Sequence, residues 1–311
     1  MNDSRVLVTG GSGFIGSHLV KRLVKMGAEV HLLSRNRSII DNVRLKDVWS
    51  KLKIVNADIR NFDSLAPLKK LEPEIVFHLA AYHHVGDSFT HFSEALDTNC
   101  LGTSNLLEAL EEYERFVYTS TSEVYGLQSS LPFKEEMTPH PISPYAIGKY
   151  AGELYSLMKY NMGYPVIVLR PFNVYGPYQS VEALIPEMIT DCLAEKPIRV
   201  TEGKQTREFN YIDDVIDGFT SAARVKAAVG KVMNLGSSEE ISVRDLVLKI
   251  VELTKSKSKV AFGALPYRPT EIWRMFCDNT KAKEILDWTP KIGLEEGLRR
   301  TVLWFQKHHT L

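Results

Sequence analysis

Six short apolar segments in the first part of the chain constrain the fold more than any other feature of the sequence. They show no alternation of polar and apolar residues, as expected for strands that are buried on both faces. Longer amphipathic segments separate them, so the pattern predicts βαβ units around a parallel sheet. We expect strands at Arg5–Thr9, Glu29–Leu33, Lys53–Asn56, Glu74–Leu79, Arg115–Ser120 and Pro165–Arg170. We expect helices at Phe14–Met26, Phe62–Leu71, Glu94–Glu112 and Pro144–Met162.

The pattern loosens after Arg170, where prolines divide the chain into short pieces. We therefore expect a doubly wound, Rossmann-like α/β domain over residues 1–170 and a smaller α/β lobe over residues 171–311 that closes over a ligand. A later apolar run, Lys231–Leu235, again has the character of a sheet strand. The chain is therefore expected to return to the first domain once before it ends.

The overall charge narrows the choice of partner. The 311 residues include 38 basic and 38 acidic side chains, so the formal net charge is zero. A nucleic-acid binder needs a basic face that releases phosphate counterions, and no such partner is expected. Neutrality does not exclude a small anionic ligand, because a few arginines can bind a phosphate locally.

The cysteines and the apolar segments indicate the compartment. Cys100, Cys192 and Cys277 are widely spaced and form no metal or disulfide pattern, which fits a reducing cytosol. No apolar run reaches the ~18 residues of a membrane span. The few residues between Met1 and the first strand leave no room for a signal peptide. We expect a cytoplasmic protein with no membrane partner.

A glycine-rich turn follows the first expected strand. Gly10, Gly13 and Gly16 surround the point where the strand ends and a helix begins, with Phe14 and Ile15 in the first helical turn. Glycine allows the backbone to turn sharply and to approach a pyrophosphate, whose charge then lies at the helix N-terminus. This context, a strand before the motif and a helix after it, predicts a dinucleotide site.

The end of the second expected strand indicates which dinucleotide is bound. An NAD site usually has a carboxylate there to accept from the ribose hydroxyls. This chain has Ser34, Arg35 and Arg37 instead, which suits the 2′-phosphate of NADP. The alternative is that both arginines are surface charges on a loop. Asp58 and the adjacent Ile59 follow the third strand and are expected at the adenine, although an ordinary loop aspartate is also possible.

A phenol and an ammonium lie four residues apart in the last expected helix of the first domain. Tyr145 and Lys149 share one face of this helix. A nearby cation stabilises phenolate and lowers a tyrosine pKa, so Tyr145 is a candidate general base. Thr121, just after the fifth strand, offers a hydroxyl to the same substrate oxygen.

These motifs together resemble a known family, the extended short-chain dehydrogenases/reductases, and within it the NAD(P)-dependent nucleotide-sugar epimerases and dehydratases. The resemblance covers essentially the whole chain. It includes the glycine-rich turn and the Thr121, Tyr145 and Lys149 group. Further matching segments are His78–Ala81, Asn99–Thr103, Arg170–Pro177, Arg207–Asp214 and Arg268–Glu271.

The resemblance implies roles for several further residues. It places Leu79, Ala80 and Ala81 at the cofactor, and Lys149 at the nicotinamide ribose. It matches Asn173, Arg207 and Arg268 to positions that hold a nucleotide diphosphate, Glu271 to an acceptor for the nucleotide, and His83 to the substrate side. It also implies a tightly bound NAD(P), a nucleotide-diphosphate sugar as partner and a homodimer through helices near residues 94–112 and 144–162. Family members bind no metal at this site, and none is expected.

The residues after Thr121 indicate the reaction. Thr121-Ser122-Glu123 is similar to the triplet of GDP-mannose 4,6-dehydratases, in which a carboxylate can remove the C5 proton of a 4-keto sugar. We therefore expect a 4,6-dehydratase, with Ser122 and Glu123 among the catalytic residues. A 4-epimerase is the first alternative, and the same triplet occurs in UDP-glucuronate decarboxylases. A 4-keto-sugar reductase and an inactive dinucleotide-binding regulator remain as further alternatives.

Overall fold

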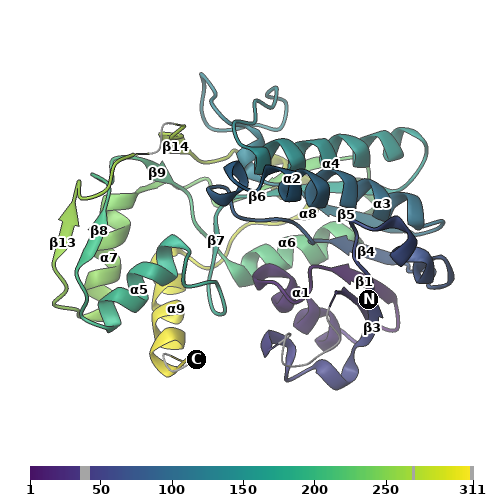
Figure 1. The fold of residues 1–311 in the computed structure, drawn as a ribbon, viewed down its shortest axis with the longest axis horizontal. Coiled ribbons are helices and arrows are strands. Elements are labelled where there is room, and N and C mark those ends of the chain that lie inside the picture. Colours follow the sequence, from purple (N-terminus) through teal and green to yellow (C-terminus); the bar gives the residue numbers. More distant parts are fainter. Residues whose placement is uncertain (36–42, 268–269, 309–311) are drawn as a thin grey trace.

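A parallel sheet forms the centre of the molecule, as a computed structural model shows for residues 1–35, 43–267 and 270–308 (Figure 1). Within these residues the large sheet has seven strands, and all its neighbouring pairs are parallel. The predicted Rossmann-like α/β fold class is therefore confirmed. From edge to edge the strands are β11 (Val232–Leu235), β6 (Val166–Pro171), β5 (Arg115–Thr119), β4 (Ile75–His78), β1 (Arg5–Thr9), β2 (Glu29–Ser34) and β3 (Lys53–Asn56).

The strand order reverses between β1 and β4. From β1 the chain adds β2 and β3 on one side, and it then crosses back to place β4 on the other side. In open α/β sheets ligands bind in the crevice outside the carboxyl ends of the strands at this switch point. Thr9 and His78, the last residues of β1 and β4, lie there.

Helices cover both faces of the sheet, which explains why its strands are apolar throughout. Figure 1 shows α2 (Phe92–Leu96), α3 (Gly102–Ala109) and α4 (Pro144–Asn161) on one face, and α1 (Phe14–Lys25) and α6 (Ile212–Arg224) on the other. Leu7 of β1 packs in the core under α3, whereas Val6 and Val8 pack in the core under α1 and α6. Burying each such side chain contributes about 1.5–3 kcal/mol.

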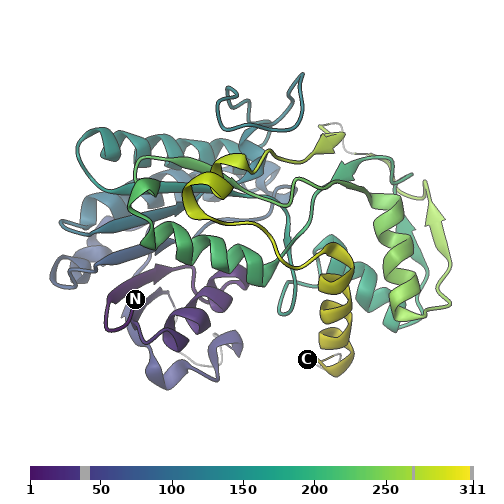
Figure 2. The same cartoon turned by 180° about the vertical axis from the view of Figure 1, so that it is seen from behind.

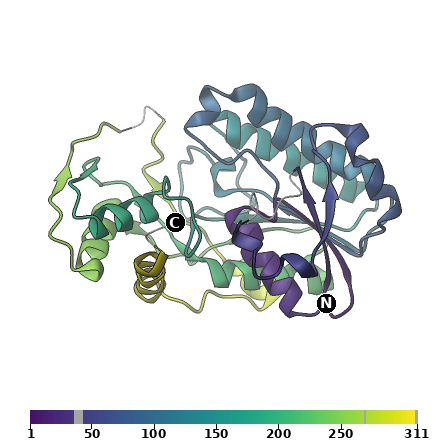
Figure 3. The ribbon, with the colours of Figure 1, turned by 60° about the horizontal axis from the view of Figure 1, so that its bottom comes forward.

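A second group of elements stands to one side of the sheet (Figure 3). Here α5 (Leu184–Leu193), α7 (Val243–Thr254) and α9 (Leu294–His308) pack together, with α9 and α7 adjacent in Figure 2. The short strands are paired as β8 (Ile198–Val200) with β13 (Val260–Phe262), β7 (Val174–Tyr175) with β10 (Asn210–Tyr211), and β9 (Thr206–Arg207) with β12 (Ile241–Ser242) and β14 (Arg274–Met275). The short helix α8 (Thr280–Leu286) lies beside α6.

The two halves of the chain are interleaved. After β10 the chain enters α6 on the face of the large sheet, and β11 then pairs with β6. A boundary at residue 170 therefore does not separate the two parts in space, because residues 232–235 form an edge strand of the large sheet.

One expected helix contains a π-helical turn and ends at Ala109, three residues earlier than expected. The segment predicted as a helix over Glu94–Glu112 forms α2, a π-helical turn at Asp97–Leu101 and α3. Within the π turn, the Asn99 side chain accepts from the Tyr82 amide at 2.8 Å and donates to the Tyr82 carbonyl at 3.0 Å. The segment Phe62–Lys70, expected as a helix, is a 3-10 helix that contains Pro67.

Candidate functional site

The glycine-rich turn has the shape that a dinucleotide requires. Gly10 has a φ of +69°, and a Cβ there would lie 2.5 Å from the Ala80 backbone nitrogen. A Cβ on Gly16 would lie 2.2 Å from the Gly10 carbonyl oxygen. The N-terminus of α1 carries no side-chain cap and no acidic residue in its first turn. The amides of Phe14 and Ile15 are therefore available to an anion, and the residues present fit a pyrophosphate.

A buried histidine ties this turn to the end of β4. His78 Nδ1 lies 2.6 Å from Thr9 Oγ1, which accepts from the Ala80 amide at 3.1 Å. His78 Nε2 lies 3.0 Å from Thr103 Oγ1, whose own proton goes to the Asn99 carbonyl. These partners assign the ring proton to Nε2, so that each hydroxyl has one donor and one acceptor role. Burial lowers the pKa of His78 to about 3, and the ring stays neutral at physiological pH.

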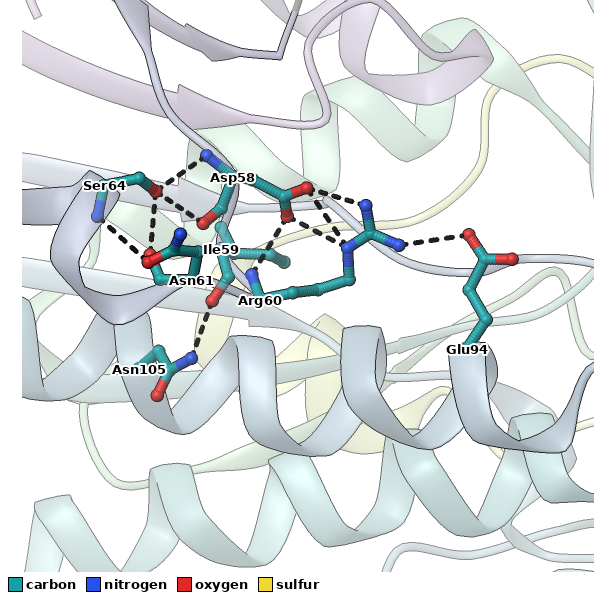
Figure 4. A network of polar contacts seen from close by, with 7 residues as sticks. All are labelled: Asp58, Ile59, Arg60, Asn61, Ser64, Glu94 and Asn105. Atoms are coloured by element: carbon teal, nitrogen blue, oxygen red, sulfur yellow. Dashed lines mark hydrogen bonds and ion pairs between the residues drawn. The ribbon is translucent and has the colours of Figure 1, made fainter.

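The residues predicted for the adenosine end lie along β2 and β3. Ser34 ends β2, and Arg35 follows it with an exposed side chain. Arg37 lies outside the described residues. Asp58 is held by Arg60, whose Nη2 lies 2.7 Å from Oδ2, and this hydrogen bond holds the pKa of the Asp58 carboxyl below its usual value (Figure 4).

Figure 4 also shows how this segment is anchored to the helices. Arg60 reaches Glu94 at 3.3 Å, and the Ile59 carbonyl accepts from the Asn105 side chain at 2.9 Å. The sequence analysis did not identify Arg60, although its spacing of two residues from Asp58 would allow the pair. The Asp58 carboxylate therefore already has a cationic partner within the chain.

Thr121, Glu123 and Tyr145 come together at the carboxyl end of β5. Thr121 is the N-cap of a short 3-10 turn, and its Oγ1 accepts from the Glu123 amide at 3.3 Å. The same hydroxyl hydrogen-bonds to Tyr145, and the charge of Glu123 also acts on Tyr145. The pKa of Tyr145 is raised to about 12: burial is the largest cause, the bond to Thr121 opposes it, and the charge of Glu123 adds to it. A cation is needed nearby before the phenol can ionise near neutral pH.

Lys149 is the cation on the same helix. It is buried in α4, with Nζ 4.5 Å from the centre of the Tyr118 ring. The Tyr118 hydroxyl donates to the Lys149 carbonyl at 2.8 Å and so fixes this turn of the helix against β5. Burial lowers the pKa of Lys149 to about 7, while Glu153 opposes this effect.

Ser122 points away from this group. Its hydroxyl lies 3.4 Å from Met275 Sδ, in a buried cluster with Val124, Phe172 and Cys277. The structure therefore gives Ser122 a packing contact with β14. A part in the chemistry stays a prediction.

Three of the predicted substrate residues lie in or near the short strands of the second lobe: Arg207 ends β9, Asn173 precedes β7 and Glu271 precedes β14. Arg207 Nη2 pairs with Glu271 Oε1, and Arg207 Nη1 donates to the Thr206 and Ile272 carbonyls. The Asn173 side chain donates to the Glu208 carbonyl at 3.0 Å, so Asn173 contacts the residue that follows Arg207. Arg268 lies outside the described residues.

His83 lies in a separate group near the turn after β7. The His83 residue is exposed and lies beside His84, with ring centres 4.7 Å apart, and His84 Nε2 lies 3.3 Å from Glu182. Burial lowers the pKa of His83. Arg44, which the sequence analysis missed, donates from Nε to the Tyr178 carbonyl at 3.0 Å in the same region.

Two general findings apply to the described part of the chain. None of its helices combines the length and apolar character needed to cross a bilayer. Across the same residues, no group of three or more His, Cys, Asp or Glu side chains is arranged to hold a metal ion.

The fold and the glycine-rich turn define a protein of the dinucleotide-binding, Rossmann-like α/β class. Comparison with known proteins narrows this class. The family model described as GDP-mannose 4,6 dehydratase matches residues 7–301. The chain is 35% identical to a UDP-glucose 4-epimerase of Mycolicibacterium smegmatis over 97% of its own length and 98% of the relative. It is 34% identical to a UDP-N-acetyl-alpha-D-glucosaminuronate decarboxylase of Bacillus cytotoxicus, over 97% of this chain and 98% of the relative.

A solved structure shows the same fold over nearly the whole chain. The UDP-glucuronic acid 4-epimerase of Bacillus cereus, in complex with UDP-glucuronic acid and NAD, superposes with a TM-score of 0.89 at 31% identity. The match covers 97% of this chain and 99% of the epimerase. The chain therefore belongs to the extended short-chain dehydrogenase/reductase family of nucleotide-sugar epimerases, dehydratases and decarboxylases.

Replacing Gly13 with Ala tests the glycine-rich turn. A Cβ at Gly13 would lie 3.2 Å from the Gly10 carbonyl oxygen, which must move by a few tenths of an ångström, and the φ of −71° suits alanine, so the variant should still fold. The methyl group would stand where a pyrophosphate approaches the backbone, and we expect NADPH and NADH to bind about tenfold more weakly or worse, a loss of about 1.4 kcal/mol. Fluorescence titration measures this, with Gly293→Ala as control because that Cβ meets no atom within 4 Å. Unchanged affinity for both cofactors would contradict the assignment.

Proposed function

We propose that this protein is an NAD(P)-dependent nucleotide-sugar 4,6-dehydratase. It would oxidise C4 of the sugar, remove water across C5 and C6, and return hydride to C6. The observation that carries the proposal is the place of Glu123, whose charge acts on Tyr145 while Thr121 bonds to the same phenol. A carboxylate beside the pair that oxidises C4 suits further chemistry on the oxidised sugar.

The first step uses the residues at the end of β5 and in α4. Thr121 orients the C4 hydroxyl, and Tyr145 takes its proton. The ammonium of Lys149 stabilises the phenolate that this requires, because the pKa of Tyr145 is raised to about 12, chiefly by burial. Bound NAD(P) would supply the hydride acceptor for this step and the hydride donor for the last one. The glycine-rich turn and Lys149 are the groups proposed to hold it, with Leu79, Ala80 and Ala81 alongside.

Glu123 is the proposed acid and base of the elimination. Oxidation of C4 acidifies the C5 proton, which the Glu123 carboxylate removes. The protonated carboxyl then gives this proton to the C6 hydroxyl, which leaves as water while a C5–C6 double bond forms. Hydride addition at C6 and protonation at C5 give a 4-keto-6-deoxy sugar. The sugar loses one water in total, and the cofactor returns to its starting state.

The diphosphate of the substrate is assigned to the second lobe. The residues proposed to hold its oxygens are Arg207, Arg268 and Asn173, whose side chain contacts the residue after Arg207. Arg207 is already paired with Glu271, so the pair would have to share the guanidinium donors with the phosphate. His83 is proposed on the sugar side.

A 4-epimerase is the second candidate, and the 35% identical Mycolicibacterium relative favours it. An epimerase shares the oxidation at C4, but it then turns the keto sugar and returns the hydride to C4. A decarboxylase, named for the 34% identical Bacillus relative, would lose carbon dioxide from a uronic sugar. In both alternatives the C6 oxygen is not lost as water, so the product distinguishes the three reactions.

Product analysis in deuterated water is the experiment that tests the proposal. The purified protein is incubated with UDP-, dTDP-, GDP- and CDP-hexoses, and the products are analysed by mass spectrometry and NMR. A dehydratase gives a product lighter by one water, with one solvent deuterium at C5 and the original C4 hydrogen at C6. Unchanged mass with inversion at C4 would identify the epimerase instead.

A pair of variants tests the residue roles within that experiment. Glu123→Gln should slow elimination by about 100-fold or more while cofactor reduction on adding sugar persists. The matched control is Ser122→Ala at the neighbouring position. Because the Ser122 hydroxyl contacts Met275, we expect this variant to turn over substrate normally. Equal losses in the two variants would shift the acid role to Ser122.

We propose a preference for NADP over NAD, supported by the exposed Arg35 directly after β2 and by the lack of a carboxylate at Ser34 and Arg35. The Bacillus cereus neighbour is complexed with NAD, so the two cofactors need direct comparison. Arg35→Ala should weaken NADPH binding about tenfold and leave NADH binding unchanged, because only the 2′-phosphate is lost as a partner. Titration of both cofactors measures this, with Arg199→Ala in the second lobe as control. Equal effects on both cofactors would rule out the preference.

We also propose a homodimer through the helices near residues 94–112 and 144–162. Ile147, Leu154 and Met158 are 47%, 49% and 41% exposed and follow one face of α4, and Leu101 beside them is 48% exposed. Such an apolar face favours a protein partner. Leu154→Lys should give monomers in light scattering after size exclusion, whereas Leu248→Lys on α7 should not. A monomeric wild-type protein would refute the dimer.

A further inference from the structure

A buried ion pair lies directly behind the catalytic lysine. Glu153 follows Lys149 by four residues in α4, and Arg170 lies near the end of β6. Arg170 Nη2 lies 2.5 Å from Glu153 Oε1, and Arg170 Nε lies 3.2 Å from Oε2. The two side chains are only 1% and 3% exposed. A bidentate pair this deeply buried requires many compensating contacts, because both charges have lost their hydration.

The same carboxylate holds the strand that leads to the active site. Ser120 donates from Oγ to Glu153 Oε2 at 2.5 Å, and the next residue is Thr121. Glu153 therefore joins three elements: α4 with Tyr145 and Lys149, the end of β5 with Thr121, and β6 through Arg170. The relative position of the three predicted catalytic side chains depends on this junction.

The ion pair of Glu153 and Arg170 also affects the charge of Lys149. Its ammonium forms no ion pair with any residue in the described part of the chain, and it is 2% exposed. The titratable groups that act on it from the elements packed against it are His78 on β4, Tyr118 on β5 and Glu153 on α4. Tyr145 lies four residues before it on the same helix.

Most of these groups are uncharged near neutral pH. His78 stays neutral because burial lowers its pKa to about 3, and burial raises the pKa of Tyr118 well above its usual value. Cys100, which faces Tyr118, also has a raised pKa and remains a thiol. Glu123 acts on Tyr145, whose own pKa is raised. Glu153 is thus the carboxylate that opposes the burial of the Lys149 ammonium among the described residues.

We propose that Glu153 and Arg170 act together as a positioning pair for the reaction, in which Glu153 keeps Lys149 protonated and holds Thr121 against α4 through Ser120. Arg170 offsets the burial of Glu153 and limits its attraction for Lys149. The proposal rests on the proposed function for its effect on turnover. Its effect on Lys149 can be measured without any sugar.

The pH dependence of NADPH binding tests the pair directly. In the wild type, affinity should fall as the pH rises through the Lys149 pKa, because the cofactor loses a cationic partner. The Lys149→Met variant should lack this fall in affinity, which would show that the fall is due to deprotonation of Lys149. In Glu153→Gln/Arg170→Met both buried charges are absent, so no unpaired charge destabilises the fold. Without Glu153 the lysine deprotonates more easily, and the midpoint should move to lower pH by about one unit.

Three single variants separate the two roles. Arg170→Met leaves Glu153 facing Lys149 alone, so the midpoint should move to higher pH. Glu153→Asp retains the charge and should rescue the wild-type midpoint. Ser120→Ala removes only the bond to the strand, and it should lower kcat for C4 oxidation at every pH without moving the midpoint.

The outcomes are distinct. A folded double variant with the wild-type midpoint would overturn the electrostatic role, and so would an unchanged midpoint in Arg170→Met if the double variant does not fold. Normal kcat in Ser120→Ala would overturn the positioning role. If no nucleotide sugar is turned over by the wild type, the proposed function fails, yet the NADPH profile still decides whether Glu153 controls Lys149.

Discussion

Burial of the central sheet on both faces is the constraint on which the rest of the structure depends. Strands that have helices on either side must be apolar throughout, and polar side chains can then gather only where the strands end. In this chain Thr9, His78 and Thr121 stand at or just after the carboxyl ends of β1, β4 and β5. The site is therefore a consequence of the sheet: its polar groups occupy the edge that the core leaves open.

Neutral hydrogen bonds and paired charges then make that edge rigid. The neutral imidazole of His78 links β1, β4 and α3 through hydrogen bonds. The carboxylate of Glu153 links α4 to the end of β5 and to β6. The chain has equal numbers of basic and acidic side chains, and several of them form ion pairs with each other. Asp58 with Arg60 and Arg207 with Glu271 are two further cases, in which a predicted ligand residue already has a partner of opposite charge. A phosphate bound at Arg207 would have to compete with Glu271 or share the guanidinium with it.

Much of the fold could be predicted from the sequence. The expected strands agree with β1 to β6 and β11 to within a residue or so at each end, because a buried strand is marked by its own composition. The helix expected over Glu94–Glu112 is present, since the chain is helical from residue 92 to residue 109, but its π turn at Asp97–Leu101 was not predicted. Asn99 in this turn contacts Tyr82, which lies outside the helix. The glycine-rich turn and the group of Thr121, Tyr145 and Lys149 could be named because their spacing is local or is carried by a family resemblance. Their roles as ligands and catalysts stay predictions.

The sequence by itself determined the class of fold, the family and the chemical groups available to the site, because hydrophobic pattern, glycine positions and short motifs are local properties of the chain. Only the tertiary structure decided how those groups are paired and charged. Nothing in the sequence indicates that Ser122 turns to Met275, that Arg60 holds Asp58, or that Glu153 stands between Ser120 and Arg170. Such contacts depend on which elements meet in the folded chain. The protonation state of a buried lysine depends on the distance to a carboxylate and on the exclusion of water, and both arise only on folding.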